Sequence, residues 1–77
     1  MKDYKYVIDY LTFRMLARMS HVQMWVYAEE GMFEDAMQSQ FNFLVYEDIA
    51  TEMYNKMTQQ QTDTLMNLFT IAYGGLQ

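Results

Sequence analysis

The feature that most constrains this 77-residue chain is where its helix-breaking residues stand. Proline is absent, and glycine occurs only at Gly31, Gly74 and Gly75. Because proline and glycine are the strongest signals for helix ends and loops, their absence from long stretches favours uninterrupted helices. We therefore predict one all-α domain of three helices, two long and antiparallel and one short, over residues 1–77.

The predicted helices cover residues 3–30, 33–57 and 59–73. Gly31 is expected to end the first helix, and the Thr-x-x-Gln sequence at residues 58–61 forms a possible capping box for the third. The apolar positions of the second helix change direction near residues 38–42, so the sequence leaves open whether this helix is continuous. The segment FNFLVY has strand propensity, but the helical period resumes after it, so we predict helix there.

The predicted first helix is apolar on two opposite faces at about 100° per residue. We expect one stripe to be the core face, and it contains Tyr4, Val7, Ile8, Leu11, Met15, Met19, Val22 and Val26. The opposite stripe contains Tyr6, Tyr10, Phe13, Ala17, Met24 and Ala28. A helix that is apolar on two faces usually packs on both. A chain this small without cysteine also gains from association, so we predict a homo-oligomer, with a two-fold dimer favoured.

Aromatic and acidic side chains near the second stripe suggest a protein-binding surface. Tryptophan and tyrosine dominate the energetics of many interfaces, and methionine adapts to varied partners. The acids around the first turn are either a solvated turn or a docking patch for a basic partner. The predicted surface consists of Tyr6, Tyr10, Phe13, Met24, Trp25, Glu29, Glu30, Glu34 and Asp35.

Arg14, Arg18 and His21 form one line on the first helix, since they are spaced i, i+4, i+7. This basic line is unusual in a chain with a formal net charge of −5. One interpretation is that the arginines pair with carboxylates of the second helix or of a second copy. The alternative is a pocket for a small anion such as a nucleotide, because guanidinium groups bind phosphate and carboxylate well.

Other kinds of chemistry are poorly supported. The chain has no cysteine, one histidine and no Glu-x-x-His pair, so we expect no metal and no cofactor. Ser20 adjoins His21, but neighbouring helical residues point about 100° apart, which is not the geometry of a nucleophile and its base. The net negative charge argues against binding to a nucleic-acid backbone. We therefore expect no enzyme activity.

The sequence contains no run of about 18 apolar residues and no secretory h-region near its start, so we expect a soluble, cytoplasmic protein without a membrane partner. The favoured function is a non-enzymatic interaction module that acts by stoichiometric binding to a protein partner. A narrower hypothesis is a small phage-type inhibitor of a host CRISPR, other defence or transcription system, acting in the host cytoplasm. The alternative is an oligomeric anion- or nucleotide-binding protein that uses Arg14, Arg18 and His21.

Overall fold

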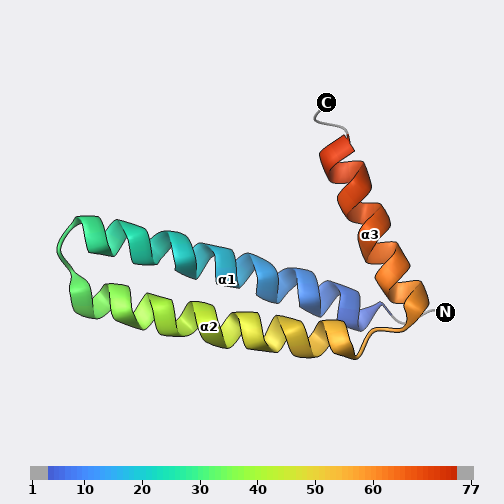
Figure 1. Ribbon diagram of the computed structural model, residues 1–77, viewed down its shortest axis with the longest axis horizontal. Coiled ribbons are helices and arrows are strands. Elements are labelled where there is room, and N and C mark those ends of the chain that lie inside the picture. Colours follow the sequence, from blue (N-terminus) through green and yellow to red (C-terminus); the bar gives the residue numbers. More distant parts are fainter. Residues whose placement is uncertain (1–3, 75–77) are drawn as a thin grey trace.

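The computed structural model describes residues 4–74, and these residues form three helices and no strand. The helices are α1 (Lys5–Glu29), α2 (Phe33–Asn55) and α3 (Gln59–Gly74) (Figure 1). The all-α prediction is therefore confirmed. Helix α2 runs without a break through residues 38–42, which settles the question that the drift of its apolar positions had raised. The predicted first helical residue, Asp3, and Gly75 lie outside the described residues.

The turn between α1 and α2 is as short as predicted because Gly31 closes α1 in a Schellman motif. Gly31 has a φ of 76°, in the left-handed region that glycine adopts without strain. The Gly31 amide donates to the Ala28 carbonyl (3.1 Å), and the Met32 amide donates to the Tyr27 carbonyl (2.9 Å). Since α2 begins two residues after Gly31, the chain reverses and the two long helices lie side by side as an antiparallel hairpin (Figure 1).

Helix α3 starts at the capping box that the sequence predicts. The Gln61 amide donates to Thr58 Oγ1 (3.2 Å), while Gln61 Oε1 accepts from the Thr58 amide (2.9 Å). This reciprocal pair occupies two backbone donors that the first turn of a helix leaves without partners. The N-terminus of α3 is thus defined locally, independent of packing against the hairpin.

The seam between α1 and α2 is built mainly from small residues. Its fully or nearly fully buried positions are Ala17, Ser20, Ala36, Ser39 and Ala50. Small side chains let two helix backbones approach closely, so dispersion contacts extend along the seam although few large side chains are buried. Larger residues that are half-buried line its margins, including Phe13, Phe43 and Tyr46.

The prediction that the Tyr4-to-Val26 stripe of α1 is the core face is wrong for most of its members. Ile8, Met15 and Met19 expose 62%, 66% and 57% of their surface, and Val22 and Val26 are also exposed. Only Val7 of that stripe is buried. Helix α2 packs instead on the opposite stripe, because the small residues Ala17 and Ser20 on that side permit the close approach.

The molecule is open and flat. Helix α3 leaves the end of the hairpin on the α1 side and points away from it, so α1 and α3 form two arms of an angle (Figure 1). The radius of gyration is 15.2 Å, against about 11.5 Å for a compact domain of this length. The accessible surface is 6041 Å², about 1,000 Å² more than a folded monomer of this mass usually exposes.

Candidate interaction surfaces

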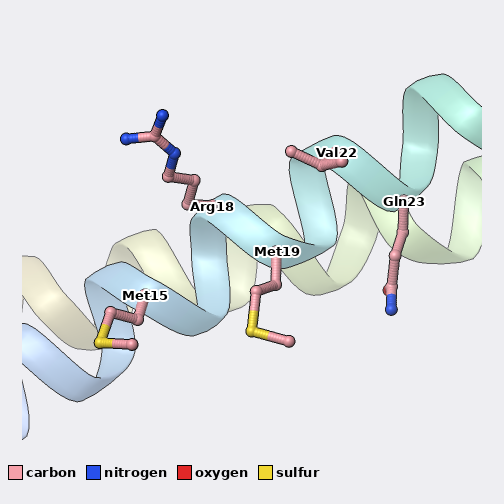
Figure 2. Close-up of a pocket in the computed structure, with 5 residues that line it drawn as sticks. All are labelled: Met15, Arg18, Met19, Val22 and Gln23. Carbon is pink, nitrogen blue, oxygen red and sulfur yellow. The ribbon is translucent and has the colours of Figure 1, made fainter.

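The side of α1 that faces away from α2 is an exposed apolar surface. We call it the α1 outer face and define it by Ile8, Met15, Met19, Val22 and Val26, all of which are exposed. A hollow of about 420 Å³ lies at its middle, lined by Met15, Arg18, Met19, Val22 and Gln23. Figure 2 shows the Met15 and Met19 side chains extending in the same direction across this face, while Arg18 extends in the opposite direction. Unbranched methionine side chains in this position can adapt to a neighbour of varied shape.

Helix α2 carries a second exposed apolar ridge along its own outer side. We call it the α2 outer face and define it by Phe33, Met37, Phe41 and Leu44. These residues are spaced at i, i+4, i+8 and i+11, so they form a ridge about 16 Å long. The ridge supplies two aromatic rings and one methionine, which are the residue types predicted to form the interaction surface of the first helix.

Acidic side chains border the α2 outer face. Glu34, Asp48 and Glu52 are exposed, and a helical projection places them within about 60° of the centre of the ridge. None of the three forms an ion pair within the part of the chain that the structure describes. The face therefore combines apolar area with unneutralised negative charge.

The predicted surface residues of α1 divide into two groups. Tyr6, Tyr10, Phe13 and Met24 are half-buried, and they lie on the α2 side of α1. The rings of Tyr10 and Tyr54 are 5.8 Å apart, and those of Phe13 and Tyr46 are 6.2 Å apart, so both α1 rings contact α2 within one chain. Trp25, Glu29, Glu30, Glu34 and Asp35 are exposed, near the turn end of the hairpin.

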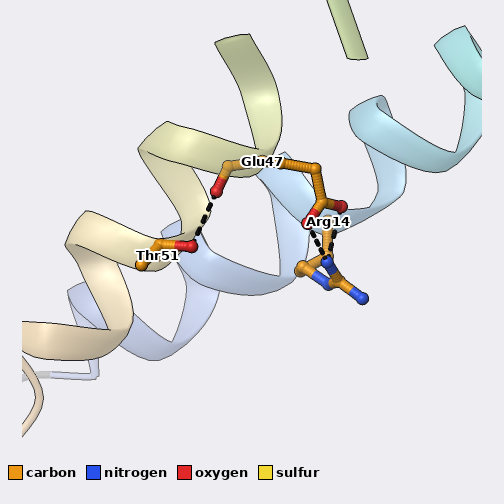
Figure 3. A network of polar contacts seen from close by, with 3 residues as sticks. All are labelled: Arg14, Glu47 and Thr51. Atoms are coloured by element: carbon orange, nitrogen blue, oxygen red, sulfur yellow. Dashed lines mark hydrogen bonds and ion pairs between the residues drawn. The ribbon is translucent and has the colours of Figure 1, made fainter. Parts of the chain in front are cut away.

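Arg14 forms an ion pair between α1 and α2. Such pairing was one of the two interpretations of the basic line on the first helix. Its Nη1 atom donates to both carboxylate oxygens of Glu47, at 2.5 Å each (Figure 3). The Glu47 backbone carbonyl accepts from the Thr51 hydroxyl at 3.0 Å (Figure 3). The Arg14 charge is therefore neutralised across the seam, by α2 of the same chain.

Arg18 and His21 have no such acid partner. Arg18 forms no ion pair within residues 4–71, and its side chain is exposed. Nε2 of His21 accepts from the Trp25 indole N–H at 3.2 Å, which places the proton of the neutral ring on Nδ1. That Nδ1 atom is buried and has no hydrogen-bond partner. Both residues line an open cleft of about 600 Å³ between the three helices. The rest of its lining is Leu11, Arg14, Met15, Phe43, Glu47 and Phe69.

Comparisons with known proteins give no relative. No family model, no curated protein and no solved structure matches this chain. Within the described residues there is no group of three or more histidine, cysteine, aspartate or glutamate side chains that could hold a metal ion. Within those residues, no helix combines the length and apolar character needed to cross a membrane.

Sequence reasoning missed both outer faces as free surfaces. Hydrophobic periodicity identifies the stripe with the most aliphatic and methionine side chains, and on α1 most of that stripe faces solvent. The signal that identifies the seam is the recurrence of alanine and serine three or four positions apart, as at Ala17 and Ser20 and again at Ala36 and Ser39. Once those positions mark the seam, the large apolar residues opposite them are the exposed faces.

Proposed function

We propose that this protein is a non-enzymatic interaction module that binds a basic amphipathic helix of a partner protein on the α2 outer face. The observation that carries the proposal is an apolar ridge of Phe33, Met37, Phe41 and Leu44 bordered by acids that have no partner in the described chain. Exposed apolar ridges of this kind on small soluble proteins usually mark sites where another protein binds.

The charge of this face defines the chemistry of the partner. Burying the ridge against an apolar or acidic partner would bring Glu34 and Asp48 toward a low dielectric without compensation, which is unfavourable. A helix with leucine-like residues on one face and lysine or arginine at its margins would cover the ridge and neutralise the acids together. A helix that packs on another helix uses apolar residues at i, i+3, i+4 and i+7, which suits a ridge about 16 Å long.

Two matched peptides test this proposal. One is a helix of about 18 residues with leucine on one face and lysine elsewhere, and the other replaces each lysine by glutamate. The lysine peptide is expected to bind the full chain with a Kd in the micromolar range that weakens with salt, and the glutamate peptide is expected not to bind. Equal binding of both peptides, or of neither, overturns the proposal.

Variants locate the binding surface. Phe41→Ala and Met37→Ala should weaken binding of the lysine peptide at least about fivefold, because truncating an interface anchor commonly costs more than 1 kcal/mol. Met15→Ala is the matched control, since Met15 is nearly as exposed as Met37 (66% against 72%) but lies on α1. If Met15→Ala weakens binding as much as Met37→Ala, the α2 outer face is not the site. Two narrower hypotheses remain predictions from composition. One is that the protein inhibits a host system on behalf of a phage, and the other is that it is cytoplasmic.

A second candidate function, capture of a small anion, is favoured by the cleft beside Arg18. An unpaired guanidinium and a buried imidazole N–H without an acceptor line the same cleft, and both are donors to an anion. Inorganic phosphate and a nucleoside monophosphate are the probes. Each should raise the melting temperature of the wild-type chain but not of Arg18→Ala. Lys56→Ala, at an exposed lysine that does not line the cleft, separates a general loss of positive charge from loss of this site. An unchanged melting temperature in the wild-type chain removes this candidate.

A further inference from the structure

We infer that a second copy of this chain occupies the α1 outer face, with the two α1 helices packed antiparallel about a two-fold axis between Met15 and Met19. This inference concerns assembly and goes beyond the proposed partner site, which lies on the other helix of the hairpin. It rests on the spacing of the exposed residues, on the polar residues beside them, and on the amount of surface that one chain leaves uncovered.

Four of the five residues that define the α1 outer face are spaced symmetrically. Ile8, Met15, Met19 and Val26 are separated by seven, four and seven positions, so the pattern is the same from either end. Two antiparallel copies can therefore place Ile8 opposite Val26 of the partner and Met15 opposite Met19 of the partner, each twice. An interface about a two-fold axis requires this kind of self-complementarity, since every contact in it occurs in both directions.

Residues on the flanks of the stripe obey the same symmetry. In a two-fold antiparallel pair, each flank of one helix faces the same flank of the other. On one flank, half-buried Leu11 then faces Val22 of the partner. On the other flank, Thr12 faces Gln23 of the partner, and Lys5, which also pairs with Asp9 at 2.6 Å, faces Glu30 of the partner. These pairs are apolar, polar and oppositely charged in a single register, whereas Arg18, on the flank of Leu11, faces its own copy.

The uncovered surface fits this arrangement. The chain exposes 6041 Å², about 1,000 Å² beyond expectation for its mass, and a standard interface buries about 800 Å² on each partner. The hollow of about 420 Å³ between Met15, Met19 and Val22 provides space for the methionines of the second copy. Because α3 leaves the hairpin on the α1 side (Figure 1), the turn end of the second copy would lie beside α3, whose Met66, Leu68 and Ile71 are exposed.

Cysteine cross-linking tests the register, because the native chain contains no cysteine. Ile8→Cys and Val26→Cys chains, mixed under mild oxidation, should form a disulfide-linked heterodimer. Each variant alone should not cross-link to itself, since the two copies of residue 8 would be about 27 Å apart, far beyond disulfide range. Efficient self-linking of Ile8→Cys would show a parallel pair and overturn the inference.

The oligomeric state provides the second measurement. Sedimentation equilibrium of the full wild-type chain should give a dimer at micromolar concentration. Met15→Glu should shift the Kd for dimerisation at least about a hundredfold toward monomer, with the helical circular dichroism retained, while Met37→Glu on α2 should leave the dimer intact. A wild-type monomer at all concentrations overturns the inference. Masses that grow beyond the dimer would indicate α1-to-α2 contacts between copies and overturn it as well.

These results are separable from those of the proposed function. Failure of the dimer would leave binding of the lysine peptide to the α2 outer face unaffected. Conversely, a chain that dimerises through α1 but binds neither peptide would retain this inference and lose the proposed partner site.

Discussion

Arg14 and Glu47 are 33 positions apart in the chain, yet Nη1 of Arg14 lies 2.5 Å from each oxygen of the Glu47 carboxylate. The pair connects the middle of α1 to the middle of α2. A single guanidinium nitrogen makes both contacts, so the geometry lacks the two parallel bonds of the strongest arginine–carboxylate pairs. The side chains also remain 48% and 31% exposed, which limits the energy that the pair can contribute.

We expect the coupling energy between Arg14 and Glu47 to be about 0.5–1 kcal/mol, because solvent screens a pair with this exposure. The measurement is a double-mutant cycle of Arg14→Ala, Glu47→Ala and the double variant, unfolded in urea at one fixed protein concentration so that association affects all samples alike. A coupling energy above about 2 kcal/mol would mean that the pair is desolvated more strongly than its exposure indicates.

The seam should be intolerant of added volume. Ala17 has no exposed surface, and Ala17→Leu is expected to reduce the free energy of unfolding by about 2 kcal/mol or more, because the extra carbons force the two helices apart. Chemical denaturation measures the change. Asn67→Leu, at an exposed position of α3, is the control and should alter stability by no more than about 0.5 kcal/mol. Equal stability of Ala17→Leu and wild type would mean that the seam can open without cost.

The turn at Gly31 gives a prediction that involves the backbone alone. A β-carbon added at Gly31 would meet no atom within 4 Å, so substitution causes no steric clash with the rest of the molecule. The φ of 76° still disfavours L-residues, and Gly31→Ala should therefore destabilise the fold by about 1 kcal/mol. Gly31→Asn should cost less, since asparagine tolerates this conformation better. If alanine and asparagine are equivalent in thermal unfolding, the left-handed geometry does not determine the effect.

The local signals in the sequence predict the helix boundaries well. Gly31 ends α1 and Thr58 caps α3, because each acts through hydrogen bonds to residues within a few positions along the chain. The continuity of α2 follows from the absence of proline and glycine between Phe33 and Asn55, since no residue there ends a helix. Features of this kind follow from short-range physics and need no knowledge of which face packs.

The face of α1 that packs could not be predicted from hydrophobicity. Ala17 and Ser20 have little apolar surface, yet they form the seam because their small size permits close approach. Met15 and Met19, with far more apolar area, stand on the opposite side. The direction of α3 also could not be predicted from the sequence. Leu65 is the single fully buried large side chain in the described residues, so no repeated pattern of buried residues marks where α3 packs. The pairing of Arg14 with Glu47 was one of two predicted outcomes, and its exact partner depended on the register of the hairpin.

The two-fold pairing of α1 leads to a further prediction at Arg18. In the inferred dimer the two copies of Arg18 lie on the same flank, within about one helical turn of the axis, and the described part of the chain offers neither of them an acid partner. At a separation of about 8 Å in water, two like charges repel by about 0.5 kcal/mol. Arg18→Ala should therefore tighten dimerisation two- to threefold in low salt, and the difference should vanish at about 1 M salt, where charges are screened within about 3 Å. Sedimentation equilibrium at both ionic strengths measures the change in the dimerisation Kd.

Arg14→Ala is the control, because the Arg14 charge is already neutralised by Glu47 and its removal should not tighten the dimer. Weaker dimerisation of Arg18→Ala in low salt would place Arg18 opposite an acid of the second copy and would exclude the proposed register.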